Sequence, residues 1–201
     1  MTTRVLMANK VALLKNESKK ALLVIDVQEN LLNPHSMLHM DPAAVFSFIN
    51  RLNKTIEFFQ AHKWPVLYTI NEWTNPVLNL ITGNVCKRGG KGTNIDNRVH
   101  VIDGNVYSKS KMNALSNKQI SLFLKDHSIS ELYITGLFAE ACVKHTARVA
   151  LKNYYKAVLI EDAIGSSNLK KKLASLLYCE RKGANIISTA ELFHQVAAEA
   201  I

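Results

Sequence analysis

The sequence predicts a single-domain α/β protein with a parallel sheet and helices on both of its faces. Short apolar runs, too short for typical helices, recur along the chain as buried strands would. Segments with helical spacing of apolar residues alternate with these runs, which is the order that builds a parallel sheet. The length of 201 residues suits one domain.

The first half of the chain predicts two strands, a long helix and a long loop. Asp41 and Pro42 precede the helical pattern and supply an N-cap and a first-turn proline. The loop is rich in Asn, Gly, Thr and Lys, and a loop of this length is usually functional or mobile. The ranges are strand 21–27, helix 43–62, strand 65–70 and loop 71–104.

In the second half, strands and helices alternate without interruption. The strands are 106–108, 130–135, 156–161 and 185–188, and the helices are 117–127, 140–153, 169–182 and 189–200. Crossovers between parallel strands are expected to be right-handed. The whole pattern predicts a doubly wound, Rossmann-like sheet in one domain over residues 20–201, preceded by an N-terminal arm of residues 1–19.

The formal charge of +9 arises from 25 Lys and Arg against 16 Asp and Glu, and such a surface can attract nucleic acid or anionic membranes. The lysines are scattered, however, and their short clusters contain no interleaved aromatic residues of the kind that stack on bases. No apolar run reaches the roughly 18 residues that span a bilayer. Neither nucleic acid nor membrane is therefore predicted as a partner, and organelle targeting by residues 1–19 stays open.

The cysteine count constrains compartment and metal content. The chain has three cysteines, at positions 86, 142 and 179. This small and odd number argues against a disulfide framework. This pattern predicts a reducing, cytoplasmic location. No C-x-x-C pair occurs, and no His pair stands at metal-ligand spacing beside a Cys or carboxylate cluster, so neither metal nor cofactor is predicted. Cys86 and Cys179 are expected to be incidental.

Three reactive residues follow three predicted strands: Asp26, Lys109 and Cys142. Open α/β sheets bind ligands beyond the carboxyl ends of their strands, so these side chains could meet in one crevice. Cys142 lies near a helix start, which favours the thiolate and offers N–H groups to an oxyanion. Asp26 could take the thiol proton and return it to an amine, and a neighbouring Lys109 would lower both their pKa values.

Each of these residues also has an ordinary structural reading. Cys142 could be a small buried hydrophobe, since free cysteine is among the most buried residue types. Asp26 could cap a helix or form an ion pair. Lys109 and its neighbour Lys111 could be solvated surface charges.

Three motifs, taken together, resemble the isochorismatase-like cysteine hydrolase family. They are residues 21–28 (ALLVIDVQ), 106–115 (VYSKSKMNAL) and 134–143 (ITGLFAEACV). They stand in the family's order, and the match extends over roughly residues 20–195. The resemblance implies a catalytic triad of Asp26, Lys109 and Cys142 that cleaves an amide-type C–N bond of a small molecule through a thioester on Cys142. It also implies a homo-oligomer.

The resemblance further implies a non-proline cis peptide at Leu137–Phe138, which helps to turn the N–H groups of Phe138 and Cys142 toward the oxyanion. The nicotinamidase branch of the family carries an Asp-x-His metal site that this chain lacks, which agrees with the expectation of no metal.

Residues just beyond the strand ends are expected to line the substrate pocket. They are Gln28 and Leu32 after the first strand, Trp73 after the second and Phe138 after the fourth. Two rival functions stay open. One is hydrolysis of a vinyl ether of the isochorismate type, which does not depend on a cysteine nucleophile. The other is a non-catalytic interaction protein on the same scaffold.

Overall fold

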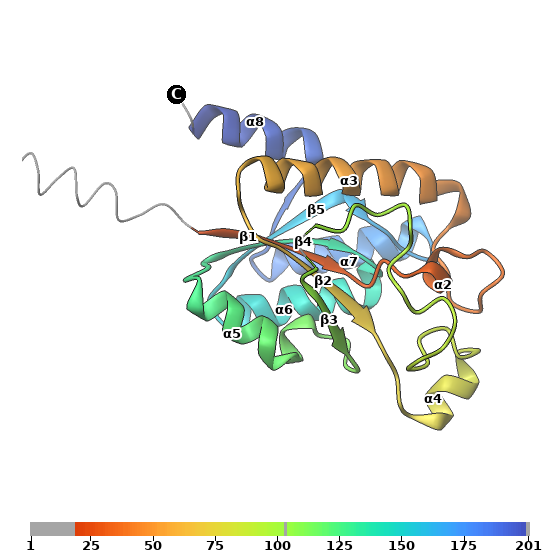
Figure 1. The fold of residues 1–201 in the computed structure, drawn as a ribbon. Coiled ribbons are helices and arrows are strands. Elements are labelled where there is room, and N and C mark those ends of the chain that lie inside the picture. Colours follow the sequence, from red (N-terminus) through yellow and green to blue (C-terminus); the bar gives the residue numbers. More distant parts are fainter. Residues whose placement is uncertain (1–18, 103, 200–201) are drawn as a thin grey trace, which may run out of the picture.

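The protein is described here by a computed structural model of residues 19–102 and 104–199. Its centre is a six-stranded, entirely parallel sheet with the order β3-β2-β1-β4-β5-β6 (Figure 1). The strands are β1 Lys20–Ile25, β2 Val66–Asn71, β3 Val106–Lys109, β4 Glu131–Gly136, β5 Lys156–Ile164 and β6 Asn185–Ile187. The predicted fold class is confirmed. The predicted N-terminal arm lies, except for residue 19, outside the described residues.

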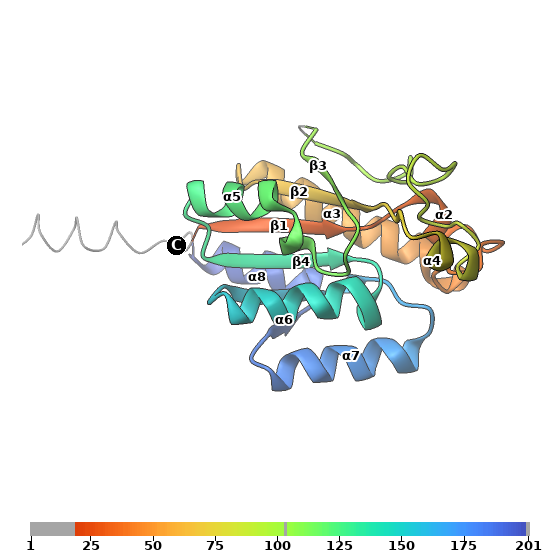
Figure 2. The ribbon, with the colours of Figure 1, turned by 90° about the horizontal axis from the view of Figure 1, so that it is seen from below.

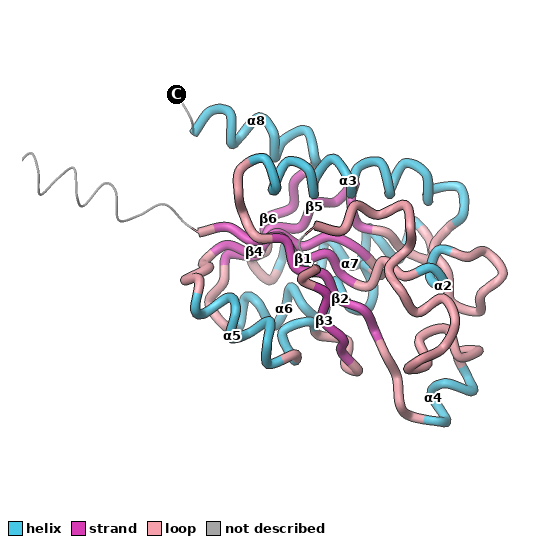
Figure 3. The backbone as a smooth tube through the Cα atoms, viewed as in Figure 1, coloured by secondary structure: helices cyan, strands magenta, loops and turns pink. Residues whose placement is uncertain are grey.

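Helices cover both faces of the sheet. The helices are α2 Glu29–Leu32, α3 Val45–Ala61, α4 Pro76–Ile81, α5 Lys118–Asp126, α6 Lys144–Lys152, α7 Leu169–Arg181 and α8 Thr189–Glu199. Helices α3 and α8 lie on one face, and α5, α6 and α7 lie on the other (Figures 1 and 2). Short α2 and α4 lie beyond the carboxyl ends of the strands, where the long loops also gather (Figure 3). None of the helices in the described part of the chain could cross a membrane.

The apolar strands explain why the sheet is covered on both faces. Successive side chains of a strand point to opposite faces, so an apolar run needs a core on each side. In β1, Leu22 and Val24 pack in the core under α3, whereas Leu23 and Ile25 pack in the core under α5 and α6. All four are essentially inaccessible to solvent.

Two predicted elements differ from the structure. The range 71–104 was expected to be a loop throughout, but it contains α4, which begins with the side chain of Asn75 capping Leu78 N–H at 3.0 Å. The short apolar segment Pro76–Ile81 is too brief to show helical periodicity in the sequence. The predicted helix 140–153 begins as a π-helical turn, Ala139–Val143, before α6 continues it.

Gly136 at the end of β4 sets the approach of β4 to β1. Its φ is +102°, which side chains rarely adopt, and an added Cβ would collide with the backbone carbonyl of Ile25. The two strands can therefore run side by side to their ends, where Ile25 pairs with Gly136. The strand order reverses between β1 and β4, so the segments that follow them flank the switch point of the sheet.

Candidate active site

The three reactive residues predicted from the sequence meet in one contact network. Lys109 Nζ donates to Asp26 Oδ2 at 2.7 Å and to Cys142 Sγ at 3.5 Å. The other oxygen of the carboxylate, Asp26 Oδ1, accepts a hydrogen bond from Thr69 Oγ1 at 2.8 Å. Asp26 is 1% exposed, Lys109 4% and Cys142 7%, so this charged network is almost closed to solvent.

The sheet topology produces this meeting. Asp26 immediately follows β1, and its left-handed φ of +52° is one that Asp tolerates better than most residues. Cys142 lies in the π-helical turn that follows β4, the neighbour of β1. Lys109 ends β3, two strands from β1, and its long side chain reaches across to the carboxylate.

Burial and charge act in opposite directions on Lys109. Burial alone would lower the pKa of its ammonium, but the Asp26 carboxylate and Cys142 outweigh burial and raise the pKa above its usual value. The ammonium also donates to the backbone carbonyl of Lys111 at 3.1 Å. Lys109 therefore remains charged and hydrogen-bonded in the closed site.

The sequence led us to expect a lowered pKa for Cys142, and this expectation was wrong. Burial raises the pKa of the thiol, the Asp26 carboxylate raises it further, and Lys109 only partly opposes them. Helix position alone does not reveal these effects, because they depend on how deeply the sulfur is buried and on which charge is nearest. Burial and the nearby carboxylate thus favour the neutral form of the Cys142 thiol beside the Asp26–Lys109 ion pair.

A cavity of about 850 Å³ opens above these residues. Asp26 and Cys142 line it, as do Trp73 and Phe138, two of the residues predicted to line a substrate pocket. Most of its lining is apolar, and it includes Leu31, Met37, Leu38, Leu78, Met112 and Leu137. Its size and its mainly apolar lining with some polar groups are typical of a small-molecule site.

Gln28 and Leu32, also expected on the wall, do not line this cavity. Gln28 is fully buried, and its side-chain amide joins two segments by donating to Thr93 O at 2.6 Å and accepting from Asn71 N at 2.8 Å. Leu32 is 4% exposed and packs in the core beneath α3. The short helix α2 instead directs Leu31, the residue before Leu32, toward the cavity. The sequence pattern does not specify this rotation.

The turn that carries Cys142 is anchored on both sides. The Leu137–Phe138 peptide bond is cis, and Leu137 N–H donates to Ile25 O at 2.7 Å. Glu140 accepts hydrogen bonds from Ser166 Oγ and Ser167 Oγ, each at 2.7 Å. These contacts tie the nucleophile turn to β1 and to the loop before α7, which fixes the sulfur relative to Asp26.

Asn71 and Cys86 are among the cavity residues that the sequence reasoning missed. Asn71 ends β2, lines the cavity and places its Nδ2 3.9 Å from Cys142 Sγ. A polar residue closing an apolar strand was the available signal for it. Cys86, expected to be incidental, is 1% exposed and also lines the cavity, where burial raises its pKa to about 12. The segment of Cys86 lies beside Trp73 only once the chain has folded, through a bridge between Trp73 and Lys87. No local sequence pattern therefore indicated that Cys86 lines the cavity.

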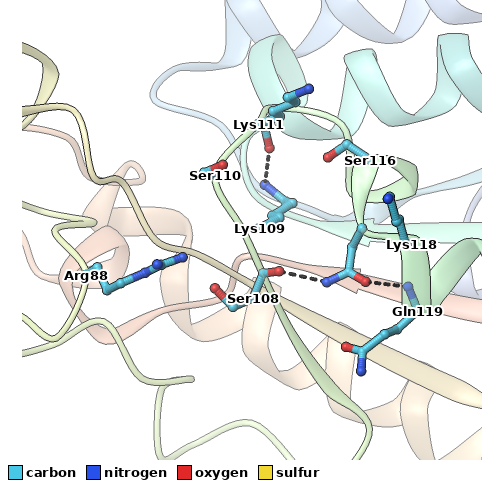
Figure 4. Close-up of a pocket in the computed structure, with 9 residues that line it drawn as sticks. Arg88, Ser108, Lys109, Ser110, Lys111, Ser116, Lys118 and Gln119 are labelled. Atoms are coloured by element: carbon cyan, nitrogen blue, oxygen red, sulfur yellow. Dashed lines mark hydrogen bonds between the residues drawn. The ribbon is translucent and has the colours of Figure 1, made fainter.

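A second cavity, of about 320 Å³, lies on another side of Lys109 (Figure 4). Its lining is polar and basic and includes Arg88, Ser108, Lys111 and Gln119, but neither Asp26 nor Cys142. The larger, apolar cavity is therefore the candidate active site. Among residues 19–102 and 104–199, no group of three or more His, Cys, Asp or Glu could hold a metal ion.

Comparison with known proteins shows the family of the chain. The sequence model of a family described as Isochorismatase domain matches residues 20–191. N-carbamoylsarcosine amidase from Arthrobacter sp is 25% identical over 161 residues, which are 74% of this chain and 60% of that protein. Enterobactin synthase component B from Escherichia coli (strain K12) is 23% identical over 190 residues, 92% of this chain and 66% of that one. The chain thus spans less than two thirds of the length of these relatives.

Solved structures share the fold. An isochorismatase family protein from Desulfovibrio vulgaris superposes with a TM-score of 0.80 at 18% identity, over 90% of this chain and 100% of that one. An N-carbamoylsarcosine amidase from Thermoplasma acidophilum superposes with a TM-score of 0.72 at 22% identity, over 85% of this chain and 96% of that one. At such identities the likeness establishes the fold and nothing finer.

Proposed function

The chain belongs to the isochorismatase domain family, and on that premise we propose that it is a cysteine hydrolase that cleaves an amide-type C–N bond of a small molecule. The observation that supports this is the buried contact network of Asp26, Lys109 and Cys142 at the end of an apolar cavity. Relatives named as amidases agree with the reaction type.

In the proposed first half-reaction, Asp26 takes the proton of the Cys142 thiol as the sulfur attacks the substrate carbonyl carbon. The carbonyl π electrons move to oxygen, and the resulting oxyanion is assigned to the backbone N–H groups of Phe138 and Cys142. When the C–N bond breaks, Asp26 returns its proton to the departing nitrogen. Ammonia or an amine leaves, and the acyl group remains on sulfur as a thioester.

In the second half-reaction, Asp26 takes a proton from water, and the oxygen attacks the thioester carbonyl. The C–S bond breaks, the acid leaves, and the sulfur regains a proton from Asp26. Lys109 keeps its charge throughout. Its ammonium holds the carboxylate and lies 3.5 Å from the sulfur, so it stabilises negative charge as the thiol gives up its proton.

The raised pKa of Cys142 fits this assignment. A neutral thiol needs a base at the moment of attack, and the Asp26 carboxylate is close enough to the sulfur to raise the pKa of the thiol. Cleavage of a vinyl ether does not require a nucleophilic thiol, and a non-catalytic binding protein has no use for a buried carboxylate–ammonium pair beside one. The geometry therefore favours C–N hydrolysis over both rivals.

A substrate panel of amides, esters and a vinyl ether, assayed with the wild type and two variants, tests the proposal. Cys142→Ala is expected to abolish amide hydrolysis, and acid quenching of the wild type should trap an acyl adduct on Cys142 by mass spectrometry. Cys179→Ala is the matched control, because Cys179 is equally buried but lies in α7 outside the cavity. Amide turnover that survives in Cys142→Ala, or turnover of the vinyl ether alone, would overturn the mechanism.

A further inference from the structure

The walls of the cavity come from segments that are distant in the sequence and share an apolar character. One segment follows β1, a second follows β2 and includes α4, and a third precedes Cys142. Their contributions are Leu31, Met37 and Leu38 from the first, Trp73 and Leu78 from the second, and Leu137 and Phe138 from the third. A volume of about 850 Å³ is far more than an acetyl-sized group would fill.

Several polar groups on these walls are hydrogen-bonded within the protein itself. His39 Nδ1 donates to Ser36 O at 2.7 Å, and Thr82 Oγ1 donates to Leu78 O at 2.7 Å. The carboxylate of Glu140 accepts from the hydroxyls of Ser166 and Ser167. A substrate lying along the walls therefore meets mainly carbon.

The cationic groups of the lining lie at its outer edge. Lys111 and Lys171 are both exposed, and Lys171 Nζ donates to Ser167 Oγ at 3.2 Å. Exposed ammonium groups keep their hydration and are screened by salt, so they contribute little to holding a ligand along the inner walls.

At the inner end, one polar group has no partner. Asn71 is 4% exposed and its Nδ2 contacts Cys142 Sγ, but its Oδ1 accepts no hydrogen bond from any described residue. A buried acceptor without a donor is unfavourable, and native proteins rarely retain one without a role. The natural donor at this place is a group that the substrate brings to the sulfur.

From these observations we infer that the substrate is an N–H-bearing carboxamide of a bulky apolar acid. Its acyl chain or ring fills the walls around Trp73, Leu78 and Phe138, and its amide N–H donates to Asn71 Oδ1 beside Cys142. This inference rests on the proposed function and adds the acyl class and the residue that recognises the nitrogen.

A homologous series of primary amides tests the acyl class. Wild-type kcat/KM is expected to rise about fourfold for each methylene that becomes buried, so that octanamide exceeds acetamide by at least about 100-fold. Binding to Cys142→Ala, measured by calorimetry without turnover, should show the same dependence on chain length. Leu78→Ala should weaken octanamide binding more than acetamide binding. Leu80→Ala is the matched control, because Leu80 lies in the same helix but is 76% exposed and outside the lining.

The outcomes separate this inference from the proposed function. Acetamide hydrolysed through Cys142 as well as octanamide would leave the proposed function standing and overturn the inference. Amide binding to Cys142→Ala that does not depend on chain length would also overturn the inference. Chain-length-dependent binding without turnover of any amide would overturn the proposed function and support the apolar acyl site.

A comparison of octanamide with methyl octanoate tests Asn71, because the ester has no N–H to donate. Asn71→Leu is expected to lower the amide-to-ester ratio of kcat/KM by about tenfold or more. Asn71→Asp keeps an acceptor and should preserve the ratio while both rates fall. Asn79→Leu is the control, since Asn79 Oδ1 is likewise buried and unpaired but lies outside the cavity lining. An unchanged ratio in Asn71→Leu would contradict the assignment.

Discussion

Replacing Lys109 by Met is expected to destabilise the protein strongly, because it leaves a charge buried without its partner. The side chains of Lys109 and Asp26 are 0% and 1% exposed, and their charged atoms are 2.7 Å apart. Removing one partner of such a pair costs about 3–5 kcal/mol, since the remaining ion has lost its water and gains nothing in return. The hydroxyl of Thr69 would still donate to the carboxylate.

The assay is urea unfolding of four proteins: wild type, Lys109→Met, Asp26→Asn and the double variant. Lys109→Met should lower the free energy of unfolding by about 3–5 kcal/mol. The double variant should recover a good part of this loss, because it contains no buried charge at either position. It should nevertheless hydrolyse no substrate, because both the proposed base and its cation are gone. The cycle thus separates stability from catalysis.

Two results would refute this reasoning. One is a Lys109→Met variant within about 1 kcal/mol of the wild type, which would mean that Asp26 is hydrated or otherwise compensated. The other is strict additivity of the two single substitutions, which would mean that the two side chains do not interact in the folded state.

Three further predictions follow from the site and the sheet. At neutral pH, iodoacetamide should label Cys142 slowly, because the thiol pKa is raised, and Asp26→Asn should speed labelling while it abolishes turnover; fast wild-type labelling at pH 7 would contradict this. The pKa of Cys179 is raised by burial from 9.0 to about 11, so the stability that its neutral thiol contributes is complete below pH 9 and is lost as the pH rises toward 11. Between pH 9 and pH 11, the melting temperature of Cys179→Ala should fall less steeply with pH than that of the wild type. Equal slopes would contradict this prediction. Gly136→Ala should lower the free energy of unfolding by about 3 kcal/mol, because the added Cβ would collide with the Ile25 carbonyl and the φ of this residue is left-handed. An unchanged midpoint of urea unfolding would contradict this prediction.

The fold and the three reactive residues could be predicted from the sequence because each depends on local pattern. Continuous apolar runs specify strands with both faces buried, and their alternation with helical segments specifies a parallel sheet. A parallel sheet brings all carboxyl ends to one edge, so Asp26, Lys109 and Cys142 had to lie near one another once their strands were recognised.

The cavity walls were predicted less well. Trp73 lines the cavity as expected, but Gln28 and Leu32 are turned away from it. Their orientation follows from α2 and from the hydrogen bonds that Gln28 makes with a segment more than 60 residues away, at Thr93. Local spacing carries no information about such long-range pairing.

The sequence by itself determined the order of strands and helices along the chain and the edge of the sheet at which Asp26, Lys109 and Cys142 meet. Only the tertiary structure decided that burial and Asp26 raise the pKa of Cys142, that Asn71 faces it and that the walls above it are mainly apolar. The physical reason is that backbone pattern is set by neighbours along the chain. Burial, charge proximity and side-chain direction are set instead by neighbours in space.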